Sequence, residues 1–107
     1  MFTFDSATLV AYGFPNPDYF DFQENTIIYG NYGGFDYSAG EIGGTITDTS
    51  LETAPTMDNY DKEFYEHDLV AQQTSDAAVL LESHIDVVQD VTTLLYNAFS
   101  ALISDWW

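Results

Sequence analysis

The chain has no cysteine, no arginine and only one lysine, Lys62. Without cysteine, disulfide bonds and cysteine-ligated zinc sites are excluded. With so few basic residues, the 18 acidic side chains have almost no internal ion-pair partners, and the net charge at pH 7 is −17. Binding to nucleic acid phosphates needs Lys and Arg side chains that displace counterions. We therefore expect no direct binding to nucleic acid.

Glycine and proline are absent from the second half of the chain. All seven glycines lie between Gly13 and Gly44, and the last proline is Pro55. Both residues favour turns and interrupt helices. We therefore predict an α+β fold in a single domain of 107 residues. Antiparallel β-hairpins or a meander would occupy about 1–48, a polar connector 49–58 and helices 59–107, with the β layer packed on a helical hairpin.

Alternating aromatic and β-branched residues indicate the strands of the first part. A turn is expected over residues 13–18, because its two prolines set φ and its Asn and Asp side chains can bond to the turn backbone. The expected strands are one broken strand or two short ones within residues 1–12, then 19–22, 26–29, and a hairpin of 35–37 with 42–47.

A long amphipathic helix is expected at about 75–106. Its apolar side chains recur at alternating steps of four and three, which keeps them on one helix face, and a second row widens the stripe. Ser75 fits the N-cap position, and Asp58 can cap a shorter helix over about 59–73. The first row is Ala77, Leu81, His84, Val88, Val91, Leu95, Ala98 and Leu102, and the second is Leu80, Val87, Leu94 and Ala101.

The length of this helix has a consequence for assembly. About 30 residues at a rise of 1.5 Å span about 45 Å, whereas a compact chain of this size has a radius of gyration of about 13 Å. We expect part of its apolar face, near His84 or at the tryptophan end, to meet a second chain. On the shorter helix, the apolar side would be Tyr60, Phe64, His67 and Ala71, and the residues mostly facing water would be Asp61, Glu63, Glu66 and Asp68.

The first residues do not resemble a cleaved secretion signal, and the last residues do not resemble a membrane span. The N-terminal residues lack the basic and long apolar regions of a secretory signal peptide. We expect a protein that stays in the cytoplasm or leaves by a route without a cleaved N-terminal signal. Residues 91–107 carry one charge, Asp105, but include several Thr, Asn and Ser residues and no basic flank. We expect no membrane span there.

One hairpin carries a resemblance to a known class of proteins. The residues Phe35-x-Tyr37-x-x-Gly40-x-Ile42-Gly43-Gly44-Thr45-Ile46-Thr47 resemble a short hairpin of acidic, calcium-associated RTX-class proteins exported by type I secretion. Those proteins also have a low pI, no cysteine and an uncleaved C-terminal signal, to which Asp105-Trp106-Trp107 is similar. Their calcium-binding nonapeptide, GGxGxD, is absent. The resemblance implies an extracellular protein, and it carries over no binding residues.

Three groups of acidic residues are candidates for a hard cation such as calcium, which takes about six to eight oxygen ligands. None has the spacing of an EF-hand loop, so a solvated acidic face is the alternative for each. His67 lies one turn from Glu63 and is a further candidate ligand for a metal or, with a tyrosine, for haem. His84 could approach His67 if the two helices pair. The groups are Asp18, Asp21 and Glu24; Asp58, Asp61 and Glu63; and Glu82, Asp86 and Asp90. The predicted metal residues are Asp18, Asp21, Glu24 and His67, with calcium as the candidate cofactor.

No catalytic motif is present. The sequence has no Ser-His-Asp or Cys-His signature and no phosphate-binding glycine loop. Acidic pairs are so frequent that they say nothing about acid–base catalysis. We therefore expect a protein without enzymatic activity.

Two functions remain open. The first is an extracellular binding or assembly protein that self-associates or binds cations through aromatic and carboxylate-rich surfaces, with Trp106 and Trp107 as the favoured patch. The second is a cytoplasmic inhibitor that mimics DNA and occupies the basic groove of a nucleic-acid enzyme. A domain from a halophile is a third interpretation, although charged residues total only 18%. The expected partner is thus a second copy or a basic protein, and the acidic partner-binding residues are Glu63, Glu66, Asp68, Glu82, Asp86 and Asp90.

Overall fold

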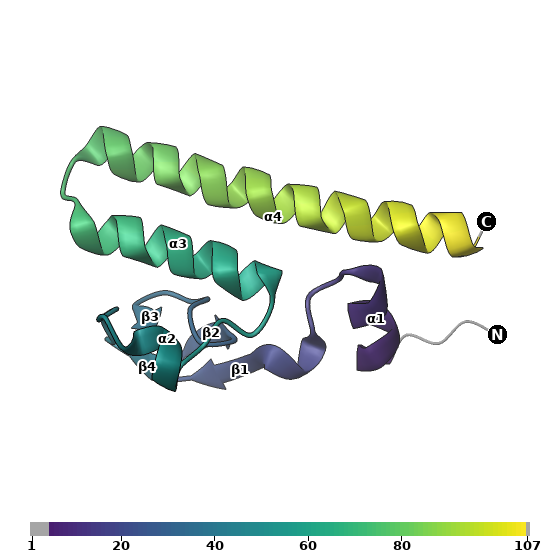
Figure 1. The fold of residues 1–107 in the computed structure, drawn as a ribbon, viewed down its shortest axis with the longest axis horizontal. Coiled ribbons are helices and arrows are strands. Elements are labelled where there is room, and N and C mark those ends of the chain that lie inside the picture. Colours follow the sequence, from purple (N-terminus) through teal and green to yellow (C-terminus); the bar gives the residue numbers. More distant parts are fainter. Residues whose placement is uncertain (1–4, 107) are drawn as a thin grey trace.

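The computed structural model describes residues 5–106, and residues 1–4 and 107 lie outside the described part. Two antiparallel β-hairpins and short helices come first, and a helical hairpin follows (Figure 1). The prediction of an α+β fold is therefore confirmed. In chain order the elements are α1 (Ser6–Tyr12), the 3₁₀ turn η1 (Pro17–Tyr19), β1 (Phe20–Gln23), β2 (Thr26–Tyr29), β3 (Tyr37–Ser38), β4 (Glu41–Ile42), α2 (Ser50–Thr53), α3 (Asn59–Gln73) and α4 (Ala77–Trp106).

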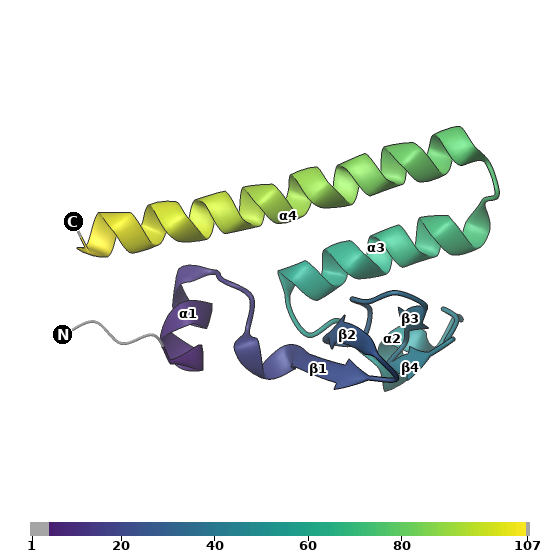
Figure 2. The same cartoon turned by 180° about the vertical axis from the view of Figure 1, so that it is seen from behind.

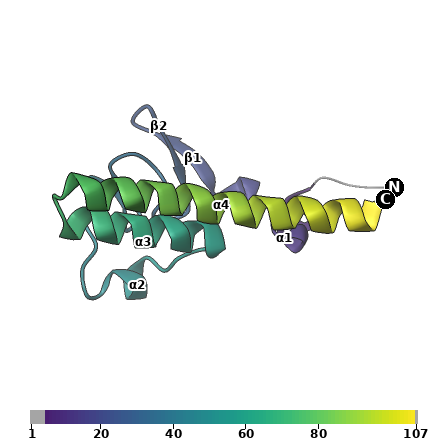
Figure 3. The same cartoon turned by 90° about the horizontal axis from the view of Figure 1, so that it is seen from above.

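The long helix α4 lies along one side of the molecule. α3 runs antiparallel beneath its first half and α1 lies beneath its second half, while the hairpins and α2 lie on the far side of α3 (Figures 1 and 2). Viewed from above, α4 partly overlaps α3 and extends well beyond it (Figure 3). The molecule is elongated, with extents of 48, 28 and 27 Å. Among the elements of residues 5–106, none covers the opposite side of α4.

Aspartate caps begin both long helices. α3 has the predicted bounds, and the Asp58 carboxylate accepts a hydrogen bond from the Asp61 backbone N–H at 2.8 Å. α4 begins at Ala77, and its first turn is capped by Asp76, which accepts from the Ala78 N–H at 2.9 Å. The prediction of Ser75 as the cap is therefore wrong. Aspartate both accepts from the first free N–H groups and favours the positive end of the helix dipole.

A helix replaces the strand predicted within residues 1–12, where residues 1–4 lie outside the described part. The Asp5 carboxylate accepts from the Thr8 N–H at 2.8 Å and starts α1. Gly13, with φ of 99°, ends it by donating to carbonyls of the last turn. Glycine adopts this left-handed conformation without steric cost. Two good caps thus outweigh the strand preference of the β-branched residues between them.

The two hairpins differ in length. β1 pairs with β2 over four residues each, and β1 begins one residue later than predicted because Tyr19 ends η1. β3 and β4 have only two residues each. The predicted return strand to Thr47 ends at Ile42. Gly43 has φ of 74° and turns the chain, and Gly44 lies so close to the Ser38 carbonyl that an added Cβ would be 2.1 Å from its oxygen. The glycine pair therefore ends the ladder instead of continuing it.

The segment predicted as a polar connector contains the short helix α2 and is tied to the loop after β2. The Tyr32 hydroxyl donates to the Ala54 carbonyl at 2.7 Å, and the Asn31 side-chain amide donates to the Pro55 carbonyl at 2.7 Å. Tyr32 is fully buried. These contacts order a stretch whose composition alone indicates only a turn-rich linker.

Asp61 is fully buried, so the prediction that it faces water is wrong. Its carboxylate accepts hydrogen bonds from the backbone N–H groups of Asn31 at 3.0 Å, Tyr32 at 2.8 Å and Met57 at 2.9 Å. Gly30 leaves the space for it, since an added Cβ would lie 2.6 Å from the Asp61 Cγ. Burial raises the pKa of Asp61, and the three N–H donors oppose that rise. One α3 side chain thus holds two separate loops.

Tyrosine hydroxyls provide further links between distant segments. The Tyr29 hydroxyl donates to the Asp58 carboxylate and accepts from the Asn16 N–H at 2.8 Å. The Tyr60 hydroxyl donates to the Gly13 carbonyl at 2.6 Å. β2 and the end of α1 are therefore both fixed to the first turn of α3.

α4 packs on α3 and α1 through one row of side chains and leaves the rest exposed. Leu81 and Val88, from the predicted apolar seam, are 60% and 64% exposed, so the prediction that they face the core is wrong. α3 has 15 residues and α1 has seven, too few to cover both rows of a helix of 30 residues. The residues that are buried or half-buried, the inner row, are Leu80, Ser83, Val87, Val91, Leu94, Leu95, Ala98 and Leu102.

The turn between β3 and β4 offers a stabilising substitution. Ala39 and Gly40 have φ of 53° and 78°, the two positive values of a type I′ turn, for which Asn-Gly is preferred. A residue such as alanine loses roughly 1–2 kcal/mol of conformational free energy in this left-handed backbone region, which Asn tolerates better. We expect Ala39→Asn to raise the free energy of unfolding by about 1 kcal/mol, measured by urea denaturation. Gly40→Ala, the control, should lower it, and a destabilised Ala39→Asn protein would contradict this turn geometry.

Candidate functional site

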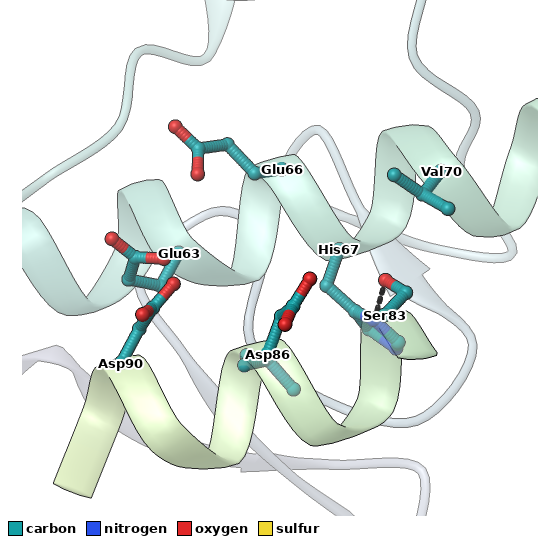
Figure 4. A pocket seen from close by; sticks show the side chains of 8 residues that line it. Glu63, Glu66, His67, Val70, Ser83, Asp86 and Asp90 are labelled. Carbon is teal, nitrogen blue, oxygen red and sulfur yellow. Dashed lines mark hydrogen bonds between the residues drawn. The ribbon is translucent and has the colours of Figure 1, made fainter. Parts of the chain in front are cut away.

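A groove between α3 and α4 gathers most of the acidic residues predicted to bind a partner. Its volume is about 200 Å³. Residues three and four positions apart lie on one face of each helix, so both helices line the groove with several side chains (Figure 4). α3 supplies Glu63, Glu66, His67 and Val70, and α4 supplies Ser83, Asp86, Val87 and Asp90.

Two carboxyl groups meet across this groove. Glu63 of α3 and Asp90 of α4 point toward each other (Figure 4). Burial raises the pKa of Glu63 to about 7, and a hydrogen bond to Asp90 and the charges of Asp90 and Glu66 add to the rise. The nearby charge of Lys62 opposes it. Near neutral pH Glu63 is therefore protonated for part of the time.

The two histidines also meet between the helices. The rings of His67 and His84 have centroids 4.7 Å apart, so their predicted approach is confirmed. His67 Nδ1 lies 2.8 Å from the Ser83 hydroxyl, and their hydrogen bond depends on the tautomer. Burial and the charge of His84 lower the pKa of His67, while the contact with Ser83 opposes that fall. The neutral ring is therefore favoured at pH 7.

Two of the acidic residues predicted to bind a partner do not line the groove. Glu82 is exposed on α4, and Asp68 lines a different hollow, between α3 and the β3–β4 hairpin. Burial raises the pKa of Asp68 to about 7, the charge of Asp61 adds to this, and the Ser38 hydroxyl opposes it. The predicted acidic surface is thus not continuous: four of its six residues line the groove, and the other two lie apart from it.

The predicted metal residues are not brought together. Asp18 and Asp21 line a shallow hollow near β1, Glu24 occupies the β1–β2 turn with φ of 48°, and His67 lies in the α3–α4 groove. Across residues 5–106, no group of three or more His, Asp or Glu side chains is arranged to hold a metal ion. Calcium binding stays a prediction.

A second candidate surface is an exposed apolar row on α4, which we call the outer row. Its residues recur at steps of three and four and therefore share one face. Of its residues, only Leu81 and Val88 belong to the apolar stripe predicted from the sequence, so the prediction did not single out this face. The outer row includes Trp106 but not Trp107, which lies outside the described residues. It consists of Leu81, Ile85, Val88, Thr92, Tyr96, Phe99, Ile103 and Trp106, all exposed.

The raised carboxyl pKa values make a prediction about stability. The pKa values of Glu63 and Asp68 are about 7 in the folded chain, against ordinary values of 4.5 and 3.8. Between these values the folded state binds more protons than the unfolded state, so stability falls as pH rises through about 7. His67 acts oppositely, because its lowered pKa makes stability fall as pH drops through its ordinary value of 6.5. The combined effect of the two carboxyl groups on the stability is larger than the opposite effect of the one imidazole.

We expect the melting temperature to be higher at pH 5.5 than at pH 8 by about 5 °C, which corresponds to about 1 kcal/mol after solvent screening. Thermal unfolding followed by circular dichroism measures this difference. Asp68→Asn, which replaces the carboxylate by a neutral group, should flatten the dependence. A melting temperature that rises from pH 5.5 to pH 8 would show that the carboxylates are specifically paired instead.

Comparison with known proteins adds no family to these observations. Within the part of the chain that the structure describes, no helix is both long enough and apolar enough to cross a membrane. The chain matches no protein-family model, and neither a curated protein nor a solved structure is significantly similar to it.

Proposed function

We propose that the protein is a non-enzymatic, acidic assembly protein that associates with copies of itself through the outer row of α4. The observation that supports this most is the exposure of Tyr96, Phe99, Ile103 and Trp106, at 69, 52, 54 and 67%. Contiguous exposed apolar surface of this kind marks interaction sites. Tyrosine and tryptophan are also enriched at the centres of protein interfaces.

The acidic surface fits the same function. A net charge of −17 keeps unassembled chains apart and soluble. Self-association then has to bury apolar surface where carboxylates are sparse, and added salt or divalent cations should favour it by screening the repulsion. The resemblance of residues 35–47 to RTX-class proteins supports an extracellular location, and a cytoplasmic location is the alternative.

The mass of the protein in solution tests this proposal. We expect size-exclusion chromatography with light scattering to give a mass above the 12.0 kDa of one chain at high protein concentration. The triple variant Tyr96→Ser, Phe99→Ser and Ile103→Ser should elute at the mass of one chain with its helical circular dichroism kept. A wild-type protein that stays at the mass of one chain, with and without calcium and at high salt, would overturn the proposal.

A second candidate is a DNA-mimic inhibitor of a nucleic-acid enzyme. It is favoured by the gathering of Glu63, Glu66, Asp86 and Asp90 along one groove. Such a protein would bind a basic partner quickly at low salt and lose it as salt rises. A pull-down that retains a nucleic-acid enzyme at low salt, and loses it with the charge-neutralising Asp86→Asn and Asp90→Asn variant, would support this candidate over self-assembly.

A further inference from the structure

We infer that two copies pair through the second half of α4, with the two helices antiparallel and their twofold axis between Phe99 and Ile103. This rests on the self-association proposed above and adds which half of the helix pairs and in which direction.

The second half of α4 presents the most exposed aromatic part of the outer row. α3 lies under the first half only, and the second half rests on α1 and on Phe14, whose ring packs edge-on against Phe99 with centroids 4.9 Å apart (Figure 1). The ring of Phe99 is nevertheless about half exposed. The half that has the least intramolecular cover therefore carries three exposed aromatic rings, those of Tyr96, Phe99 and Trp106.

The spacing of the exposed side chains in this half is the same read in either direction. Tyr96, Phe99, Ile103 and Trp106 follow one another at steps of three, four and three. A twofold interface places each residue opposite the counterpart given by its symmetry axis. With the axis midway along the set, Phe99 faces Ile103 of the second copy and Tyr96 faces its Trp106. Each contact joins two large apolar side chains.

Charge separates the two halves of α4. The first half carries three carboxylates off the outer row, those of Glu82, Asp86 and Asp90, of which the last two line the α3–α4 groove, whereas the second half carries one, that of Asp105. A parallel pair would place the acidic first halves of both copies side by side, so that they repel. In the antiparallel pair, Asp90 lies about 16 Å from the axis at 1.5 Å per residue. The acidic halves then point away from each other, beyond the Debye length of about 10 Å at 0.1 M salt.

The available area suits a weak dimer. An aromatic side chain has about 150–250 Å² of surface to bury, so the exposed fractions of the four side chains leave roughly 400–500 Å² on each copy. Two copies would bury about 900 Å², close to the lower limit of about 1,000 Å² for a specific interface. The first half of the outer row and the exposed Phe22–Ile27 pair on β1 and β2 are the competing surfaces. Both have carboxylates beside them.

Distances between spin labels on two copies test the arrangement, and the absence of native cysteine allows one label per chain. The labelled variants would be Ser100→Cys and Gln89→Cys, both at exposed polar positions. The antiparallel pair predicts a distance below about 20 Å between labels at position 100, and an axial separation of about 36 Å between labels at position 89. A parallel pair predicts short distances at both positions.

Each result has a distinct meaning. Short distances at both positions, or a long distance at position 100 with a short one at 89, would overturn this arrangement but keep self-association. If light scattering shows a dimer but neither expected distance is found, the copies pair through another surface, and this arrangement is also overturned. Absence of any dipolar coupling, together with the mass of one chain at the same concentration, would overturn the proposed function itself.

Discussion

Asp61→Ala is expected to destabilise the protein by about 4 kcal/mol or more, or to prevent folding. The substitution strips the backbone N–H groups of Asn31, Tyr32 and Met57 of their shared acceptor. Each buried donor left without a partner costs about 1–3 kcal/mol. Native domains have only about 5–15 kcal/mol of stability in total. Urea denaturation of the variant, or its far-UV circular dichroism if it is unfolded in water, measures the effect.

A matched control separates this effect from the removal of one negative charge. Asp48→Asn also removes a carboxylate, but from an exposed position in the turn before α2, and should change the free energy of unfolding by less than about 0.5 kcal/mol. Because this substitution reduces the repulsion between surface carboxylates, we expect any change to be a small gain in stability. An Asp61→Ala protein as stable as Asp48→Asn would mean that the two loops are not held by Asp61.

Leu102→Asp and Ile103→Asp are expected to have opposite consequences, although the residues are adjacent on one helix. Leu102 is 8% exposed on the inner row, and Ile103 is 54% exposed on the outer row. An unpaired charge at the first position would lie among apolar side chains, so we expect a loss of about 4 kcal/mol or more. At the second it would remain solvated, so the monomer should keep its stability while self-association is lost.

The comparison is made at two protein concentrations. At low concentration, where the wild-type chain is a monomer, the free energy of unfolding of Ile103→Asp should be within about 1 kcal/mol of the wild-type value. At high concentration, only the wild type should gain stability, because burial in a dimer favours the folded state. If Ile103→Asp unfolds the monomer, the outer row is part of the core and the orientation of α4 described above is wrong.

The long elements were predictable because their signals are local. Asp58 as a cap and the absence of glycine and proline after Pro55 define α3 and α4 to within about two residues. The β1–β2 hairpin follows from its run of aromatic and β-branched residues. Capping, turn chemistry and strand preference act over a few neighbouring residues, so one sequence is enough to recognise them.

The rest depended on contacts between distant segments. Asp61 follows the same helical pattern as the exposed acids, and only the backbone of residues 30–32 and Met57 explains its burial. Apolar side chains occupy more than one face of α4, and the short α3 and the unexpected α1 decide which of them pack inward. Of the candidate site, the meeting of His67 with His84 was foreseen, while the approach of Glu63 to Asp90 was not.

Side-chain footprinting over a concentration series tests most directly whether the outer row of α4 is the interface. Hydroxyl radicals label exposed aromatic side chains, and Phe35, which is 86% exposed in the loop between β2 and β3, is an internal reference. These two strands lie on the side of α3 away from α4 (Figure 1). We expect labelling of Tyr96, Phe99 and Trp106 to fall several-fold as the protein concentration rises, while labelling of Phe35 stays constant. Labelling of the α4 residues that does not change with concentration, or protection confined to β1 and β2, would contradict self-association through this helix.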